Sequence, residues 1–366
     1  MSWKMITANL VARPVRSLVS VLAVALEVTL ILVVVGLTSG IASETGKRIE
    51  GIGADIMLQP PNASVFLAMN TSSMSALLGG KIAEVPGVKA VSPVLVMMNS
   101  EGGLELVWGI DPKSFDDVSG GFIWHKGKVF SSPNEIVIDD WWASARKLDV
   151  GDEVEILNHK FKVSGIVEHG KGARVYLSLA AAQEMNGAKD RVSVFFIKTQ
   201  SSDQIEPVSQ ALGVLLPTYP IRDLRAYASL MTSANLPALD AFISTVVFVA
   251  VCIGVLVIFL SMYTTITERT REIGILRSLG ASKAFIVRLI FMESAAVCLL
   301  GVVAGLGLSQ VIARSVKFVF PTLVVLITPD WIIRASIFAI LSGIIGSLYP
   351  SMKAAAQDPI EALAYE

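Results

Sequence analysis

Four long apolar runs dominate the pattern of apolar and polar positions along the chain. Each run is long enough to cross the hydrocarbon of a bilayer, which takes roughly 20 residues at about 1.5 Å of rise each. The pattern therefore predicts membrane spans over residues 17–40, 241–263, 289–313 and 331–349. Although basic residues precede the first run, its apolar core is longer than that of a typical signal peptide, so we interpret it as a retained anchor.

Residues 41–225 have a different pattern, in which short strand-like stretches alternate with helix-like stretches. The segment DEVEILNHKFKVSGIVE alternates apolar and polar residues around Asn158 and His159, which is typical of a hairpin. The segments EIVIDDWWASARKL and RVYLSLAAAQEMNG each read as a strand followed by a helix. The predicted fold class is therefore an α-helical membrane protein with four transmembrane helices and a large extracytoplasmic α/β domain inserted between helices 1 and 2.

Shorter segments complete the predicted organisation. An amphipathic helix over 1–16 is expected on the inner membrane surface. A helical stalk over 226–240 is expected to carry the outer domain onto the second span. The remaining segments are a cytoplasmic helix and loop over 264–288, a short outer connection over 314–330 and a cytoplasmic C-terminal helix over 350–366.

Composition and charge narrow the class of protein. Only 17% of the residues are charged and the mean hydropathy is +0.64, which indicates an integral membrane protein. The net charge of -1 argues against a nucleic-acid binder. Both cysteines, Cys252 and Cys298, fall inside apolar runs, so no disulfide framework is expected outside the membrane.

The distribution of Lys and Arg predicts the orientation of the spans, because cytoplasmic loops carry an excess of basic residues. It places both termini and the loop 264–288 in the cytoplasm and residues 41–240 outside. The basic residues next to the spans on the inner side are Lys4, Arg13, Arg16, Arg269, Arg271, Arg277, Lys283, Arg288 and Lys353, against Arg314, Lys317 and Arg334 on the outer side.

The segment TERTREIGILRSLGAS, between the second and third spans, predicts a short amphipathic helix. At 100° per residue, Ile275, Leu276 and Leu279 share an arc with Ile273 at its flank and Glu272 near its centre. Arg271, Arg277 and Gly274 lie towards the opposite side. Gly280 ends the helix, and Ser282 can cap the next one. An ordinary basic loop explains the arginines but not the helix and its tight stop. The apolar stripe with a carboxylate in it suits docking into a groove on a partner protein.

Two motifs give this chain a resemblance to a known family. ERTREIGILRSLGAS resembles the cytoplasmic coupling motif of MacB/FtsX-like ABC transporter permeases, and YPSMKAAAQDPIEALAYE is similar to that family's C-terminal ending. In the ending, Asp358, Pro359 and Glu361 form a predicted capping box. The outer stretches GADIMLQPP and VPGVKAVSPVL are similar to the family as well, and the order of span, outer domain and three spans is the same.

The resemblance implies a mechanotransmission-type (type VII) permease subunit in the inner membrane. It implies a cytoplasmic ATPase dimer as partner, a second permease copy or paralogue, and an extracytoplasmic adaptor as a further candidate partner. The work expected is export or extraction of a hydrophobic, lipid-linked or peptide-like substrate. The site residues that the resemblance assigns to ATPase coupling are Glu268, Arg269, Arg271, Glu272, Gly274, Ile275, Leu276, Arg277, Leu279 and Gly280.

No catalytic site is predicted in the chain itself. The nearest match to a phosphate-binding loop, GIVEHGKG at Gly165–Gly172, ends in glycine where such loops need Ser or Thr, so we interpret it as a strand end and a loop. His125, His159 and His169 match no metal-site spacing. We therefore expect a non-catalytic subunit without a bound cofactor or metal, with ATP and magnesium acting through a partner ATPase.

Two carboxylates lie within or close to the predicted spans. Glu27 is near the middle of the first span, where an unpaired charge costs roughly 2.5–3.5 kcal/mol, so it must face the protein interior, carry a proton, or both. It could form a hydrogen bond across a dimer, line a path for substrate or protons, or make a structural hydrogen bond. Glu293 is shallower in the third span, and a structural role is favoured.

Three other functions are alternatives to this one. A mechanotransmitter that regulates a cell-wall enzyme belongs to the same family. A membrane-anchored receptor would need a cytoplasmic signalling domain, whereas the predicted inner segments are short helices. An intramembrane enzyme would need paired polar groups within the spans, and one mid-span carboxylate does not supply them.

Overall fold

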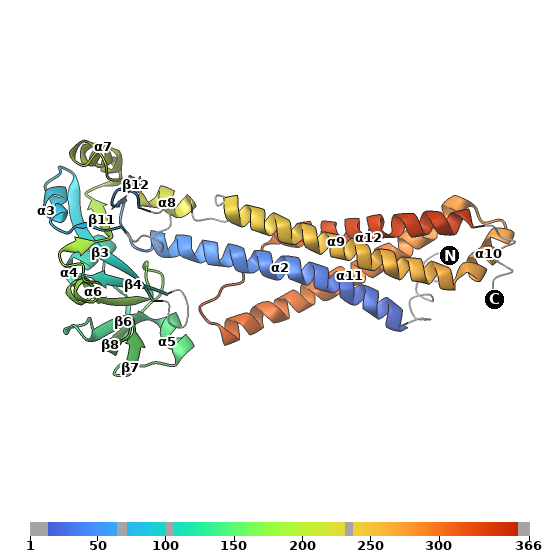
Figure 1. Cartoon of the computed structure of the whole chain (residues 1–366), viewed down its shortest axis with the longest axis horizontal. Helices are drawn as coiled ribbons and strands as arrows, with labels where there is room; N and C mark the ends of the chain where they lie inside the picture. Colours follow the sequence, from blue (N-terminus) through green and yellow to red (C-terminus); the bar gives the residue numbers. More distant parts are fainter. Residues whose placement is uncertain (1–13, 64–71, 100–104, 231–236, 358–366) are drawn as a thin grey trace. The chain divides into compact units, whose positions relative to one another are not determined.

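The structure is a computed structural model that describes residues 14–63, 72–99, 105–230 and 237–357 (Figure 1). The chain divides into two compact units. The helical unit takes residues up to 40 together with 237–318 and 323 onwards, and the second unit, the outer domain, takes 41–236 and 319–322. Residues 1–13 of the predicted amphipathic helix and the predicted capping box lie outside the described residues, and residues 14–16 belong to the first long helix.

In its described residues, the helical unit is built from four long helices and one short helix. Their bounds are α2 Pro14–Glu50, α9 Pro237–Glu268, α10 Thr270–Ser278, α11 Lys283–Val319 and α12 Pro329–Ala356. All except α10 are long and apolar enough to cross a membrane. Every long helix extends beyond the span predicted for it, because hydropathy falls at the membrane surface while the helical hydrogen bonding continues.

The C-terminal region differs from the predicted division at residue 350. There α12 runs without interruption through Pro350 to Ala356, so the described part of the predicted separate C-terminal helix belongs to the fourth long helix. The start of α12 agrees with the sequence pattern, since Thr328 lies at the N-cap and Pro329 at the first turn, although the Thr328 side chain makes no capping hydrogen bond.

Small residues allow the long helices to approach closely. A Cβ added at Gly301 of α11 would lie 2.5 Å from Val24 of α2, and one at Gly305 would lie 2.8 Å from Val28. At Gly346 of α12, an added Cβ would lie 2.7 Å from a backbone oxygen of α9. These glycines are packing residues, as expected for membrane helices that associate through close backbone contact.

The outer domain contains a mixed ten-stranded sheet with the order β12-β1-β11-β3-β4-β9-β6-β8-β5, in which β7 pairs with β8. The pairs β4–β9 and β6–β8 are parallel, and the other pairs are antiparallel. In the described residues, β2 and β10 form a separate two-stranded antiparallel sheet. The strands of the two sheets are β1 Ile56–Leu58, β2 Met74–Ser75, β3 Val88–Asn99, β4 Glu105–Ile110, β5 Trp124–Gly127, β6 Glu135–Asp139, β7 Glu153–Ile156, β8 His159–Val167, β9 Val175–Ser178, β10 Arg191–Val192, β11 Val194–Thr199 and β12 Ile221–Asp223.

Short helices accompany this sheet. They are α3 Leu78–Ala83, α4 Pro112–Ser119, α5 Asp140–Arg146, α6 Leu179–Met185, α7 Ile205–Leu215 after the 3₁₀ turn η2 Ser202–Gln204, and α8 Leu224–Leu230. The predicted strand–helix pairs are confirmed, since β6 leads into α5 and β9 into α6. The predicted stalk is described only in part, because residues 231–236 lie outside the described ranges.

The predicted hairpin is confirmed with a shift of one residue. Its turn is formed by Leu157 and Asn158, both with positive φ (53° and 60°), and His159 is already the first residue of β8. Two successive residues with positive φ are typical of a type I′ turn, which matches the twist of the flanking strands.

An aromatic cluster forms one core of the outer domain. The ring of the buried Trp108 stacks on Phe196 at 5.4 Å and meets Phe115 and Tyr176 edge-on. Gly172 lies directly under this ring with φ of +72°, so a Cβ there would overlap the indole. The glycine-rich stretch is therefore the end of β8 and a loop closed by a tryptophan, as the sequence interpretation holds.

Candidate functional site

The candidate coupling site is α10, and its inner face is held against the helical unit. Ile273 and Gly274 are buried. At the start of the helix, the Arg269 guanidinium lies 3.1 Å from the Glu272 carboxylate and 3.6 Å from that of Glu293 on α11. Near its end, Arg277 donates a hydrogen bond to the carbonyl of Ala355 on α12, at 3.3 Å.

The end of α10 has the hydrogen bonds of a Schellman motif. Gly280 adopts φ of +96° and its N–H bonds to the carbonyl of Arg277, while the N–H of Ala281 bonds to the carbonyl of Leu276. The Ser282 hydroxyl then accepts a hydrogen bond from the N–H of Phe285, which caps α11. The helix stop and restart predicted from the sequence are both present.

The outer face of α10 carries an exposed apolar stripe next to a carboxylate. Leu279 is 79% exposed and Ile275 44% exposed, and the Glu272 side chain is 62% exposed. Arg271 is exposed as well, whereas Leu276 is half-buried against the helical core. The exposed apolar stripe is therefore narrower than the predicted arc.

The predicted coupling residues separate into two groups in the structure. Arg269 and Arg277 have partners within the chain and hold the helix in place, as do the buried residues on its inner face. The residues that remain exposed are Glu268, Arg271, Glu272, Ile275, Leu279 and Gly280. Sequence periodicity finds the helix, but only its contacts decide which face points outwards.

Glu27 lies where three long helices meet. Its side chain is 5% exposed, and its Oε1 lies 2.8 Å from the hydroxyl of Ser342 on α12. A Cβ added at Gly254 of α9 would overlap the Glu27 carboxyl group. The Ser342 partner, 315 positions away in the sequence, was not found by sequence reasoning because Ser is common in membrane helices. Glu293, by contrast, pairs with Arg269, as its favoured structural role requires.

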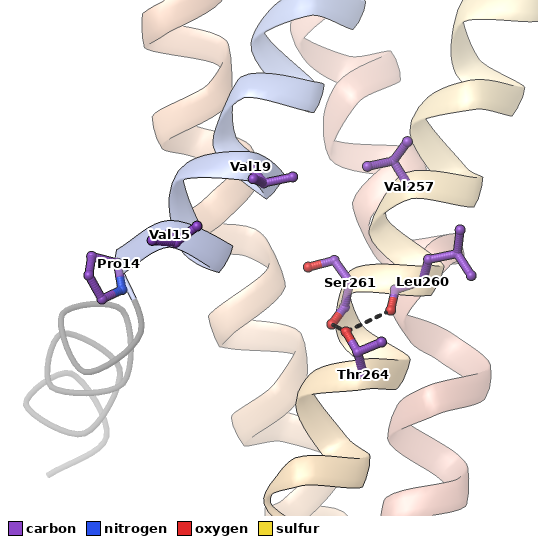
Figure 2. A pocket seen from close by; sticks show the side chains of 7 residues that line it. All are labelled: Pro14, Val15, Val19, Val257, Leu260, Ser261 and Thr264. Carbon is purple, nitrogen blue, oxygen red and sulfur yellow. Dashed lines mark hydrogen bonds between the residues drawn. The ribbon is translucent and has the colours of Figure 1, made fainter.

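An apolar pocket lies between α2 and α9 (Figure 2). It encloses about 620 Å³. It is lined by Pro14, Val15 and Val19 of α2 and by Val257, Leu260, Ser261 and Thr264 of α9. The Ser20 and Ser261 hydroxyls join the same two helices at 2.5 Å.

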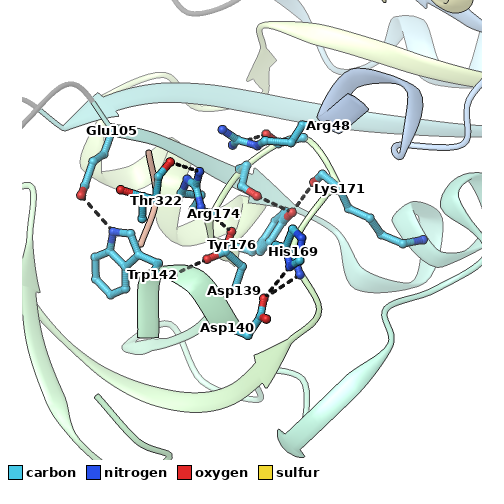
Figure 3. A network of polar contacts seen from close by, with 12 residues as sticks. Arg48, Glu105, Asp139, Asp140, Trp142, His169, Lys171, Arg174, Tyr176 and Thr322 are labelled. Atoms are coloured by element: carbon cyan, nitrogen blue, oxygen red, sulfur yellow. Dashed lines mark hydrogen bonds and ion pairs between the residues drawn. The ribbon is translucent and has the colours of Figure 1, made fainter. Parts of the chain in front are cut away.

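A buried polar network in the outer domain was missed by sequence reasoning (Figure 3). Arg48 of α2 donates a hydrogen bond to the carbonyl of Gly172. Arg174 lies 3.3 Å from the Asp139 carboxylate and also donates to the carbonyl of Thr322, in the α11–α12 connection. Because its members come from four separate stretches of sequence, no local motif marks the network.

Burial governs the electrostatics of this network. Desolvation raises the pKa of Asp139 to about 6, although the neighbouring Arg174 acts in the opposite direction. Desolvation and the positive charge of Arg174 both lower the pKa of Arg48. Burial also raises the pKa of Tyr176, whose hydroxyl donates to the carbonyl of Ala173 at 2.8 Å.

The histidines make local contacts. The His169 ring stacks on Trp141 at 3.9 Å between centroids and its Nδ1 lies 3.0 Å from Asp140. Within the described residues, no group of three or more His, Cys, Asp or Glu side chains is arranged to hold a metal ion. Trp141 and Trp142 lie in the first turn of α5.

Comparison with known families identifies the class of the protein. Residues 17–214 match the MacB-like periplasmic core domain, which is more than half of the 366 residues, and residues 244–359 match the FtsX-like permease C-terminal model. The chain therefore belongs to the MacB/FtsX-like family of ABC transporter permeases, a class of membrane protein. This agrees with the four apolar helices and with the domain inserted between the first two.

The chain is similar along its length to curated relatives. It is 22% identical to the uncharacterised ABC transporter permease YknZ of Bacillus subtilis, covering 99% of this chain and 98% of that protein. It is 25% identical to an uncharacterised ABC transporter permease of Methanocaldococcus jannaschii, covering 60% and 58%. It is 22% identical to the macrolide export ATP-binding/permease protein MacB of Psychrobacter cryohalolentis, covering 99% of this chain but only 59% of that protein.

Two solved structures align with about half of the chain. The extracellular domain of the YknZ transporter from Gram-positive bacteria aligns at 18% identity with a TM-score of 0.37, covering 46% of this chain and all of that domain. The periplasmic region of MacB from Actinobacillus actinomycetemcomitans aligns at 15% identity with a TM-score of 0.38, covering 50% and 96%.

Proposed function

We propose that this permease couples ATP hydrolysis by a separate cytoplasmic ATPase to movements of its outer domain. The observation that carries the proposal is the outer face of α10, where Leu279 and Ile275 stay exposed beside Glu272 while the opposite face is buried. Exposed apolar residues beside charged ones are typical of a protein–protein interface. The α10 face is the docking site for the ATPase.

The anchoring of α10 supports a mechanical role. Arg269 and Arg277 connect it to α11 and α12, and it follows α9 after a break at Arg269. A load applied to the outer face of α10 is therefore transmitted to three of the long helices. We propose further that the chain works as a dimer in the inner membrane with both termini cytoplasmic, and that ATP and magnesium act only through the ATPase.

The proposed work is export or extraction of a hydrophobic, lipid-linked or peptide-like molecule. The name of the Psychrobacter relative, a macrolide export ATP-binding/permease protein, supports export coupled to an ATP-binding partner. An extracytoplasmic adaptor is a further proposed partner of the outer domain.

Site-specific photo-crosslinking in cells tests the docking site. The photoreactive amino acid p-benzoyl-phenylalanine replaces Leu279, and the adducts are identified by mass spectrometry. We expect an adduct with a protein that contains a phosphate-binding loop of the ATPase type. The matched control places the same amino acid at Phe318, which is 88% exposed at the other end of α11.

The proposal predicts the ATPase adduct at Leu279 and no such adduct at Phe318. The absence of an ATPase adduct at Leu279, in cells in which the permease is inserted and active, contradicts it. An equal yield of ATPase adduct at both positions contradicts it as well, because the two ends of α11 face opposite sides of the membrane in the proposed orientation.

A further inference from the structure

The environment of Glu27 suits a neutral carboxyl group. Its Oε1 lies 2.8 Å from the Ser342 hydroxyl oxygen, which itself lies 2.9 Å from the carbonyl oxygen of Phe338. A hydroxyl has one proton to donate and can accept at the same time. If Glu27 is protonated, its O–H donates to Ser342 and Ser342 donates to Phe338. If Glu27 is ionised, the two acceptors compete for one proton.

The surroundings of the second carboxyl oxygen of Glu27 also suit a neutral carboxyl group. Glu27 Oε2 is buried and has no hydrogen-bond partner among the described residues. It lies against Gly254, where the absence of a side chain lets the carboxyl group approach the α9 backbone. A carbonyl oxygen of a neutral acid tolerates such an apolar contact far better than one half of a carboxylate.

We propose that Glu27 is a proton-binding site within the membrane spans that locks α2 to α9 and α12. With the proton bound, the carboxyl group is neutral and the three helices pack around it. When the proton leaves, the carboxylate needs donors or water that this packing does not supply, and α9 separates from α2. The inference deepens the proposed function, because it makes the proton a regulator of the helix movements that the ATPase drives.

Within the described spans, a second carboxylate, Glu293 on α11, pairs with Arg269. Along α9, the charged residues Asp240 and Glu268 lie near the helix ends, and Cys252 is an exposed thiol. On α11, Cys298 packs against Gly343, next to Ser342. Both cysteines are removed in the experiment below, so that the only thiols are the two introduced ones.

The same two helices provide a reporter of the lock. Ser20 of α2 and Ser261 of α9 have hydroxyls 2.5 Å apart, two turns from Glu27. Ser261 also lines the apolar pocket (Figure 2). Cysteines at these positions form a disulfide only while the helices stay together. Separation of α9 from α2 at the pocket would also open a route for water towards the carboxyl group.

The test uses the full chain in nanodiscs without an ATPase, as Ser20→Cys with Ser261→Cys in a background of Cys252→Ala and Cys298→Ser. The disulfide yield is measured from pH 5 to pH 9, with and without Glu27→Gln. Because thiol oxidation itself depends on pH, each yield is divided by that of the Glu27→Gln chain at the same pH. We expect this ratio to fall at least threefold as the pH rises.

A ratio that stays constant over the whole pH range overturns the proposal. Glu293→Gln is the matched control, since its carboxylate pairs with Arg269 away from the lock, and it must leave the fall unchanged. If the disulfide ratio no longer falls with pH in Glu293→Gln, the group that titrates is Glu293, and the assignment to Glu27 is refuted.

Infrared difference spectroscopy gives a second measurement that needs no engineered disulfide. Between low and high pH, the chain with native Glu27 shows a carboxylic-acid C=O band that Glu27→Gln lacks; the same spectrum in both chains refutes the proposal. If no ATPase adduct forms at Leu279 but the disulfide ratio still falls with pH, only the ATPase proposal is refuted. If the adduct forms but the ratio stays constant, only the proposal for Glu27 is refuted.

Discussion

Replacing the exposed apolar residues of α10 by alanine should weaken ATPase binding, and the more exposed the side chain, the larger the loss of affinity should be. Full burial of a Leu or Ile side chain is worth about 1.5–3 kcal/mol. Leu279 is 79% exposed and so has most of that still to gain on docking, about 1–2 kcal/mol. Ile275 is 44% exposed, and its gain is about half as large.

These free energies convert into affinities. For Leu279→Ala we expect the affinity for the ATPase to fall about 5–30-fold, and for Ile275→Ala about 3–5-fold. The inner-face variant Ile273→Ala should instead lower the thermal stability of the helical unit, because Ile273 is 8% exposed and has little left to bury in a complex.

The assay is binding of the ATPase captured at Leu279 to nanodiscs that contain each variant. Surface plasmon resonance gives the dissociation constants, and thermal unfolding of the same samples reports stability. If Ile273→Ala weakens binding more than Leu279→Ala at equal folded fraction, the face of α10 that carries Ile273 contacts the ATPase, and the docking site proposed at Leu279 is refuted.

Three further predictions follow from single contacts. Glu272→Lys, or Gly274→Trp at the buried inner face, should abolish co-purification of the ATPase while membrane insertion persists; co-purification at the native level would contradict the site. The folded state holds the Asp139 proton with a pKa of about 6, above that of an unfolded Asp. The contribution of Asp139 to stability is therefore fully present below about pH 4 and is lost, by about 3 kcal/mol, as the pH rises through about 6. Asp139→Asn, measured by thermal unfolding against pH, should lose this part of the dependence. Gly172→Ala should lower the stability of the outer domain by about 2–4 kcal/mol, since φ is +72° and the new Cβ overlaps Trp108; an unchanged melting temperature would contradict that packing.

Local patterns were enough to find the elements of the candidate site. The sequence alone located α10, its stop at Gly280 and the cap at Ser282, because these depend on residues within one or two turns of each other. Packing decides what the local pattern does not contain. Leu276 was assigned to the docking arc, yet it packs against the helical core, because the break at Arg269 sets the rotation of the helix.

The outer domain shows the same division. Alternation and turn chemistry predicted the hairpin, and strand-to-helix transitions predicted β6–α5 and β9–α6. The buried network of Arg48, Asp139 and Arg174 left no trace in the sequence, because an ion pair across a mixed sheet depends on strand order. Strand order is decided by the packing of the whole domain.

The amino-acid sequence by itself determined the class of this protein: the four apolar helices, the inserted α/β domain and the family resemblance. Hydropathy and turn chemistry act over short distances, so they can be followed along the chain. Only the tertiary structure decided which face of α10 is exposed and which serine lies beside Glu27. Those contacts join residues as far apart as Glu27 and Ser342, and they exist only once helix packing has set the rotation and depth of every helix.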